Sequence, residues 1–257
     1  MRLHPTRSKC AALFSILATS MTVVTLGGCR ATPPPESKFD EGAPAMHKQA
    51  GDPFERSWFQ AGLDGKKYDE ILVRPVNMNY VVAQNWWEGA GAENAEKLKK
   101  DFKTIADYTR GQVIQAAQTD PAHRFKVVET AGPRTMVVEL AITQLVPSKV
   151  GLQLAGIATP WAEVLMVGGG VLTSSQDTGK GVIAVEGRVR DGATKKVIFM
   201  FADREAGVAS AVDMTAYSWW GPEKYYIDTW ANDLVQVLHN PATANVKAPP
   251  TFQLMVW

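Results

Sequence analysis

Cysteine, histidine and excess charge of either sign are scarce in this chain of 257 residues. It contains two cysteines and four histidines, and its 27 basic residues nearly balance its 26 acidic ones, for a formal net charge of +1. A near-neutral chain has no basic field to attract nucleic acid. No two histidines have zinc-ligand spacing, and there is no HExxH motif. We therefore expect no metal, no other cofactor and no nucleic acid partner.

The N-terminus combines a basic stretch with an apolar run. Residues 1–9 contain three basic residues and no acid, and residues 10–28 contain no charge, which is the layout of a secretory signal peptide. The run ends in a motif that resembles a lipobox, formed by Leu26, Gly27, Gly28 and Cys29. The resemblance implies cleavage before Cys29, a diacylglycerol on its sulfur and an N-linked acyl chain such as palmitate. The alternative is an uncleaved membrane anchor with a plain thiol.

Lipidation of Cys29 would tie the chain to one leaflet, because two or three acyl chains on one residue make release negligible. Cys10 would leave with the signal peptide, so the mature chain would have no internal disulfide. Arg30 follows at the position where Asp favours inner-membrane retention in enteric bacteria. We expect a lipoprotein of the bacterial cell envelope, at the outer membrane and facing the periplasm.

The rest of the chain divides by composition. Residues 29–57 are rich in proline, glycine, alanine and charge, which predicts a flexible tether behind the lipidated cysteine. Residues 58–239 have the length and patterning of a single domain. Residues 240–257 form a tail that contains Pro249-Pro250 and ends in an apolar stretch. This tail either docks on its own domain or adds to another chain by strand pairing.

The sequence of the first half of the domain predicts one strand and one long helix. Residues 69–76 are β-branched and apolar, and Pro75 places this strand at an edge or ends it there. From Glu93 the apolar residues recur at helical spacing, and the helix ends before Asp120, which precedes a proline. The apolar positions of this helix are Leu98, Phe102, Ile105, Thr109, Val113 and Ala116.

Two β-hairpins and a second helix are predicted in the remainder. Residues 125–130 and 135–146 flank a four-residue turn, and residues 182–190 and 196–203 flank a turn that begins with Asp-Gly. A final helix begins near Gly221-Pro222. This order predicts an α+β two-layer sandwich, with a mixed or largely antiparallel sheet of about five strands packed against two main helices.

Several of these stretches resemble an uncharacterised family of bacterial lipoproteins, known as domain of unknown function 3313. The features that carry the resemblance are Leu26-Gly27-Gly28-Cys29, Tyr68-Asp69-Glu70-Ile71-Leu72-Val73-Arg74-Pro75-Val76, Val185-Glu186-Gly187-Arg188-Val189-Arg190-Asp191-Gly192 and Phe201-Ala202-Asp203-Arg204. The resemblance implies an α+β domain in the bacterial envelope. It implies no established activity and no catalytic residues.

The candidate partner surface comes from two apolar regions. Residues 150–172 carry one charge, one proline and three successive glycines, which is typical of either an apolar flap or a crossover loop packed on the sheet. The aromatic residues around position 220 are either a binding surface or a cover for the sheet edge. The residues assigned to the candidate surface are Trp161, Leu165, Met166, Trp219 and Trp220.

Three functions follow from these features. The preferred one is a lipid-anchored, non-enzymatic envelope module that binds or assembles with a protein or cell-wall partner. The first alternative is a carrier that closes the 150–172 flap over a lipid or another apolar ligand. The second is a cryptic hydrolase that uses Asp203 or Glu205, although Asp203-Arg204-Glu205 is more simply a solvated strand end. No recognisable catalytic set is present, so we expect no enzyme.

Overall fold

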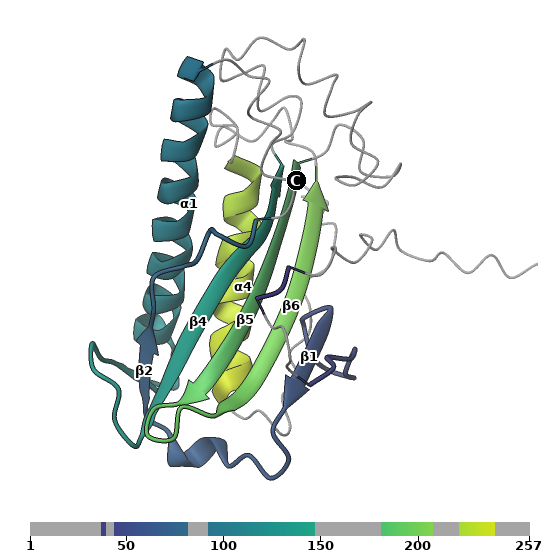
Figure 1. Ribbon diagram of the computed structural model, residues 1–257. Coiled ribbons are helices and arrows are strands. Elements are labelled where there is room, and N and C mark those ends of the chain that lie inside the picture. Colours follow the sequence, from purple (N-terminus) through teal and green to yellow (C-terminus); the bar gives the residue numbers. More distant parts are fainter. Residues whose placement is uncertain (1–36, 40–43, 82–91, 147–180, 208–220, 240–257) are drawn as a thin grey trace, which may run out of the picture. The chain divides into compact units, whose positions relative to one another are not determined.

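The computed structural model describes residues 37–39, 44–81, 92–146, 181–207 and 221–239 (Figure 1). These residues form a six-stranded mixed sheet with two long helices. None of the described helices is both long and apolar enough to cross a bilayer.

The sheet has the strand order β1-β6-β5-β4-β2-β3. β2 runs parallel to both of its neighbours, and the other pairs are antiparallel. The strands are β1 (Arg56–Phe59), β2 (Glu70–Val73), β3 (Lys126–Val127), β4 (Thr135–Val146), β5 (Gly181–Asp191) and β6 (Val197–Gly207).

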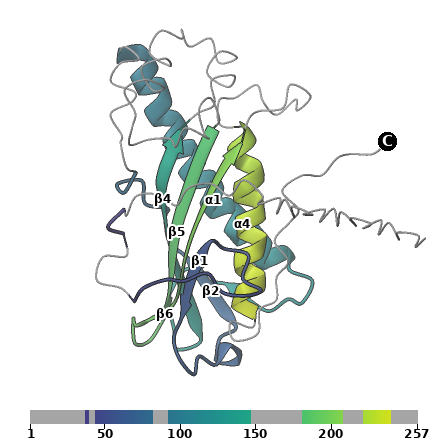
Figure 2. The same cartoon turned by 90° about the vertical axis from the view of Figure 1, so that its right-hand side faces the viewer.

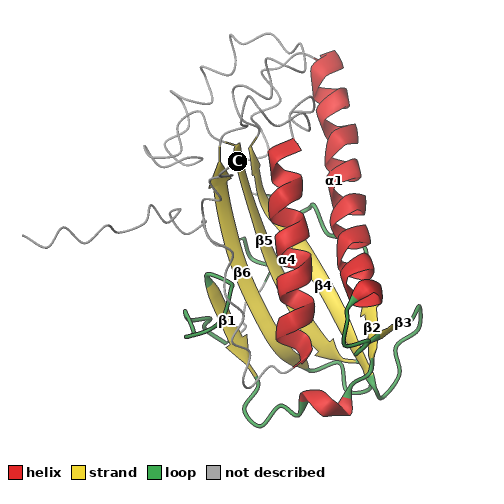
Figure 3. Cartoon of the chain, turned by 180° about the vertical axis from the view of Figure 1, so that it is seen from behind, coloured by secondary structure: helices red, strands yellow, loops and turns green. Residues whose placement is uncertain are grey.

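Both long helices, α1 (Ala92–Thr119) and α4 (Gly221–His239), lie on the same face of the sheet. They stand behind the strands in Figure 1 and in front of them in Figure 3. The predicted two-layer α+β sandwich is confirmed. The other face is called here the helix-free face.

The core lies between the helices and the sheet, and alternate residues of the strands supply one side of it. Side chains that point toward the helices include Val138, Leu140, Val185, Phe199 and Phe201. The predicted apolar positions of α1 from Phe102 to Ala116 are buried against them. α1 ends as predicted, because Asp120 precedes a proline and accepts hydrogen bonds from the backbone N–H groups of Ala122 and Arg124.

The Asp-Gly hairpin is confirmed, with β5 and β6 antiparallel over their length. The other predicted hairpin is wrong, since β2 lies between β3 and β4 and pairs in parallel with both. Ile71 and Val73 point to the core and Leu72 is also buried, so β2 takes a neighbour on each side. Parallel pairing requires a long crossover connection, which α1 provides.

The segment predicted as a tether is partly folded. Residues 44–57 belong to the domain, because β1 begins at Arg56 and the side chain of Phe54 is fully buried. The Phe54 ring stacks on that of Phe201, with 4.1 Å between ring centroids. The backbone of this segment is fixed by Lys48, whose Nζ donates to the carbonyl oxygens of Asp52 and Phe54. The domain therefore begins earlier than composition indicated.

The two ends of the sheet differ in their connections. At one end, tight connections such as the β5–β6 turn and the 3-10 helix η1 (Gly65–Lys67) join the elements. At the other end Val146 pairs with Val182, and Gly181 pairs with Gly207. α4 also begins at this second end, at the top of Figures 1 and 2. We call the first of these ends the turn end and the second the loop end.

Candidate binding site

A charged cluster lies on the helix-free face, where β4 and β5 pair. Glu139 of β4 stands opposite Arg188 of β5. Its Oε2 accepts hydrogen bonds from Arg188 Nε at 2.5 Å and from Arg190 Nε at 3.0 Å. Burial acts to raise the pKa of Glu139, but the two guanidinium groups hold that pKa below its usual value. The three side chains are 25–27% exposed, so they remain accessible to a ligand.

The N-terminal residues Ser37–Phe39, called here the strap, bind beside this cluster. Ser37 Oγ donates to Glu186 Oε2 at 2.6 Å, and Arg188 Nη1 donates to the Phe39 carbonyl oxygen at 2.9 Å. The Arg188 guanidinium lies 4.3 Å from the centroid of the Phe39 ring, a cation–π distance. Phe39 also meets Tyr80 edge to face. The helix-free face thus holds a short peptide segment through charge, ring and backbone contacts.

Other residues of the Val185–Gly192 stretch have structural roles. Gly187 lies under the Phe201 ring, where a Cβ atom would come within 2.1 Å of a ring carbon. Asp191 accepts hydrogen bonds from Lys67 Nζ at 2.6 Å and from the Tyr68 hydroxyl at 2.8 Å. Burial acts to raise the pKa of Asp191, but these donors and two backbone N–H groups hold it well below its usual range. At Gly192 a Cβ atom would lie 2.3 Å from the Gly132 carbonyl oxygen.

The candidate hydrolase residue Asp203 is buried within β6, which corrects the interpretation as a solvated strand end. It accepts hydrogen bonds from Trp230 Nε1 at 2.8 Å and from the Glu55 N–H at 3.2 Å. Burial raises the pKa of Asp203 to about 6. Glu205 is half-buried further along the same strand. A raised pKa meets one requirement of a general acid.

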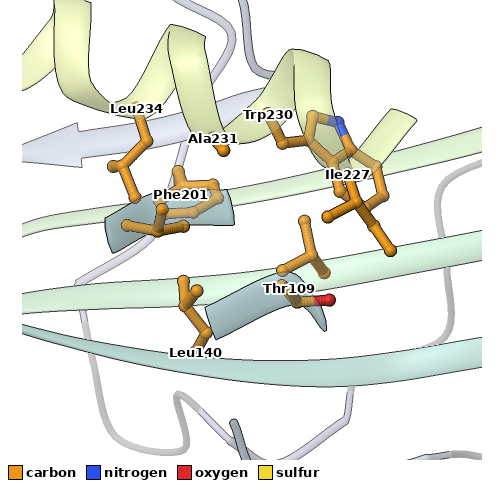
Figure 4. Close-up of a pocket in the computed structure, with 9 residues that line it drawn as sticks. Thr109, Leu140, Phe201, Ile227, Trp230, Ala231 and Leu234 are labelled. Atoms are coloured by element: carbon orange, nitrogen blue, oxygen red, sulfur yellow. The ribbon is translucent and has the colours of Figure 1, made fainter. Parts of the chain in front are cut away.

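A small cavity lies beside Trp230, whose Nε1 donates to Asp203. This cavity lies between α1, α4 and the sheet and is lined by apolar side chains and by Thr109 (Figure 4). It leaves about 10 Å³ for the centre of a water molecule. This volume suits about one water rather than a lipid or a sugar. Among the described residues, no group of three or more acidic, histidine or cysteine side chains could hold a metal.

Sequence reasoning missed two further buried carboxyl groups on α4. Burial, together with the nearby charges of Asp203 and Asp52, raises the pKa of Asp233 to about 7. Burial raises the pKa of Glu223 to about 8, although the backbone N–H of the same residue acts to lower it. The position of Asp233, three residues after Trp230 on the apolar side of the helix, was the signal that could have identified it.

The predicted partner residues lie outside the described residues, as do the lipobox, Cys29, the 150–172 flap and the tail. The residues concerned are Leu26, Gly27, Gly28, Cys29, Trp161, Leu165, Met166, Trp219 and Trp220.

The structure does place the strand ends that flank the candidate surface. Residues 147–180 connect Val146 to Gly181, and residues 208–220 connect Gly207 to α4, so both connections leave from the loop end. Tyr225, in the second turn of α4, is 57% exposed near this end. Further along α4, Trp230 belongs to the core, and His239 pairs with Asp120 at 2.8 Å at the end of the helix.

The model of a family described as "Protein of unknown function (DUF3313)" matches residues 44–234. The chain belongs to this family. The family resemblance inferred from the sequence is therefore confirmed, and the matched region of this DUF3313 protein begins at the folded segment that precedes β1.

Two curated relatives of this DUF3313 protein are described as the uncharacterized lipoprotein YdcL, from Escherichia coli strain K12 and from Escherichia coli O157:H7. Each is 30% identical over 141 residues, which cover 55% of this chain and 56% of the relative. The match thus spans about half the length of these relatives. The relatives and the family agree with the predicted class, a lipoprotein of unknown function.

Solved structures give a weak similarity. Two structures of the PelC dodecamer from Paraburkholderia phytofirmans align with TM-scores of 0.35 and 0.34 and with 11% and 10% identity. The alignments cover 69% of this chain and 95% and 96% of the PelC chains. Similarity of this extent carries no conclusion about assembly or function.

Proposed function

We propose that this DUF3313 protein is a lipid-anchored, non-enzymatic module of the bacterial envelope that binds a protein or cell-wall partner at its loop end. The anchor is the acylated Cys29 of the mature chain, in agreement with the lipoprotein relatives. Arg30 after the lipidated residue favours the outer membrane, with the domain in the periplasm.

The observation that supports the loop end is the convergence of strand ends. Val146, Gly181 and Gly207 lie side by side across β4, β5 and β6, and α4 starts at the same end. The two connections that contain the apolar candidate residues therefore begin and end at neighbouring positions. A rigid sheet that carries variable connections at one end is a common way to build a binding surface. The exposed ring of Tyr225 adds a described aromatic side chain near that end.

Site-specific photo-crosslinking in intact cells tests this proposal. We expect a crosslinker placed at Tyr225 to capture a discrete partner, because the position is exposed at the loop end. A crosslinker at the exposed Lys66 of the turn end serves as the matched control and should capture nothing specific. Deletion of residues 157–171 should abolish the adduct at position 225. The same adduct at both positions, or none at position 225, would contradict the assignment.

The anchor is tested separately by intact-mass analysis of the protein extracted from membranes. We expect a chain that begins at Cys29 and carries a diacylglycerol and a further acyl chain. A Cys29→Ser variant should remain at the precursor mass and should carry no lipid. A wild-type chain that still begins at Met1 would refute the lipid anchor.

A further inference from the structure

The helix-free face carries more positive than negative charge around Glu139. Arg188 and Arg190 share this single carboxylate. Arg74 follows β2, and its backbone N–H donates to the Val138 carbonyl oxygen, so it continues the β2 pairing along β4. Side chains alternate along an extended chain, and Val73 points to the core, which places Arg74 on the helix-free face beside Glu139. We call Arg74, Glu139, Arg188 and Arg190 the arginine cluster.

The cluster retains unused donors. A guanidinium group has five N–H donors. Arg188 uses Nε for Glu139 and Nη1 for the Phe39 carbonyl oxygen, and Arg190 uses Nε for Glu139 and Nη1 for the Lys195 carbonyl oxygen. Arg74 is exposed and makes no ion pair or side-chain hydrogen bond with the described residues. Arg74, Arg188 and Arg190 thus outnumber Glu139 and the nearby Glu186, which accepts a hydrogen bond from Ser37 Oγ. This surplus of positive charge on rigid strands suits an acidic ligand.

The occupant of the cluster in this structure indicates which acidic ligand fits. The strap contributes an aromatic ring under Arg188, a backbone carbonyl and the Ser37 hydroxyl. In the sequence the strap is flanked by Glu36 on one side and by Asp40 and Glu41 on the other, so the whole segment reads ESKFDE. Because the contacts use a backbone carbonyl and a ring, a peptide fits this site better than a polymer that carries charge alone.

We propose that the arginine cluster is a docking site for an acidic protein segment that contains an aromatic residue, and that the strap is its intramolecular occupant. A partner segment of the same chemistry displaces the strap: its ring takes the place of Phe39 and its carboxylates bind the remaining donors of Arg74 and Arg188. This site lies on the helix-free face and is independent of the loop-end surface proposed above.

The strap itself must be released before the site can be measured. A tethered segment competes at an effective concentration in the millimolar range. The double variant Ser37→Ala/Phe39→Ala removes the hydroxyl and the ring and should open the cluster in the otherwise intact chain. The probe is a fluorescent peptide with the sequence of residues 33–43, PPPESKFDEGA, and its binding is followed by fluorescence anisotropy in detergent micelles.

We expect the double variant to bind the probe saturably and at least about tenfold more tightly than the unmodified chain does. Adding Arg188→Ala should weaken binding by about tenfold or more, because a charged hydrogen bond and a ring contact are lost. Adding Arg74→Ala, which leaves every described contact of the fold intact, should weaken it about two- to fivefold. Lys103→Ala removes an exposed cation from α1, on the other side of the sheet, and should change nothing.

Probe variants decide between the proposed ligand and plain charge attraction. A probe with alanine in place of the phenylalanine, and a probe with amides in place of its acids, should both bind more weakly. No saturable binding to the double variant would overturn the proposal. So would binding that is unchanged by Arg74→Ala and Arg188→Ala in proteins whose circular dichroism is native. Equal binding of the alanine probe, or of dextran sulfate in its place, would show a general polyanion surface and would also overturn it.

Discussion

Gly187 marks the tightest packing that the structure records along the Val185–Gly192 stretch. A Cβ atom at this position would lie 2.1, 2.5 and 2.9 Å from three carbons of the Phe201 ring. That ring cannot move aside easily, because it is fully buried and stacked on Phe54. The absence of a side chain at residue 187 therefore allows β5 to lie directly under an aromatic layer.

We expect Gly187→Ala to lower the free energy of unfolding by about 1–3 kcal/mol, the usual range for an overpacked core. Gly111→Ala is the matched control, since a Cβ atom there meets nothing within 4 Å and the position lies inside α1. The control should raise the free energy of unfolding by about 0.5–1 kcal/mol, because alanine is the better helix former. Urea unfolding measures both changes. Similar effects of the two substitutions would show that the Phe201 layer is not tightly packed.

At the scale of elements, the segment before β1 is the least expected part of the domain. Phe54 brings it into the core beside Phe199 and Phe201. Ser57 Oγ donates to the Asp52 carboxylate, and the Asp203 carboxylate of β6 accepts the Glu55 N–H. Composition predicts a tether because the segment has few apolar residues, but the buried Phe54 ring and these hydrogen bonds fix the segment to the domain.

We expect Phe54→Ala to destabilise the domain by about 3–5 kcal/mol, which is typical of the loss of a buried phenylalanine. Thermal unfolding of the full chain measures the effect. Phe54→Leu should recover a large part of the loss, since leucine restores most of the buried volume. If residues 44–57 were a tether, both variants would unfold at the same temperature as the wild type.

At the scale of the whole molecule, buried acids make stability depend on pH. The pKa values of Asp203, Asp233 and Glu223 are raised to about 6, 7 and 8. In the unfolded chain such groups ionise near pH 4. The folded protein therefore holds more protons between about pH 4 and pH 8, and its stability falls as the pH rises through the folded pKa values. Below about pH 4 the stability instead rises with pH, because the lowered pKa values of Asp191 and Glu139 favour their ionised forms.

We expect the free energy of unfolding to be lower at pH 8 than at pH 5. Asp233→Asn removes one of the titrating groups, so the variant should lose less stability than the wild type over this range. Asp107→Asn alters an exposed carboxylate paired with Lys103 on α1 and should leave the wild-type profile unchanged. Urea midpoints at both pH values measure the difference. A wild-type stability that rises from pH 5 to pH 8 would contradict the prediction.

Local sequence determined most of the elements. The helical spacing from Phe102 to Ala116 and the Asp-Gly turn at residue 191 each depend on neighbours within a few residues, and both are confirmed. The proline after Asp120 ended α1 for the same reason. The lipobox motif and the DUF3313 resemblance are equally local patterns, which a single sequence can display.

Features that depend on contacts between residues far apart in the sequence were decided only by the tertiary structure. β2 lies between β3 and β4 because its buried residues take neighbours on both sides, and no turn signal encodes that choice. Phe54 joins the core and Ser37 meets Glu186, 149 residues away, through contacts that leave no periodic trace in the sequence. Local patterns specify elements because their forces act between near neighbours, whereas a docking face such as the arginine cluster exists only after distant strands have paired.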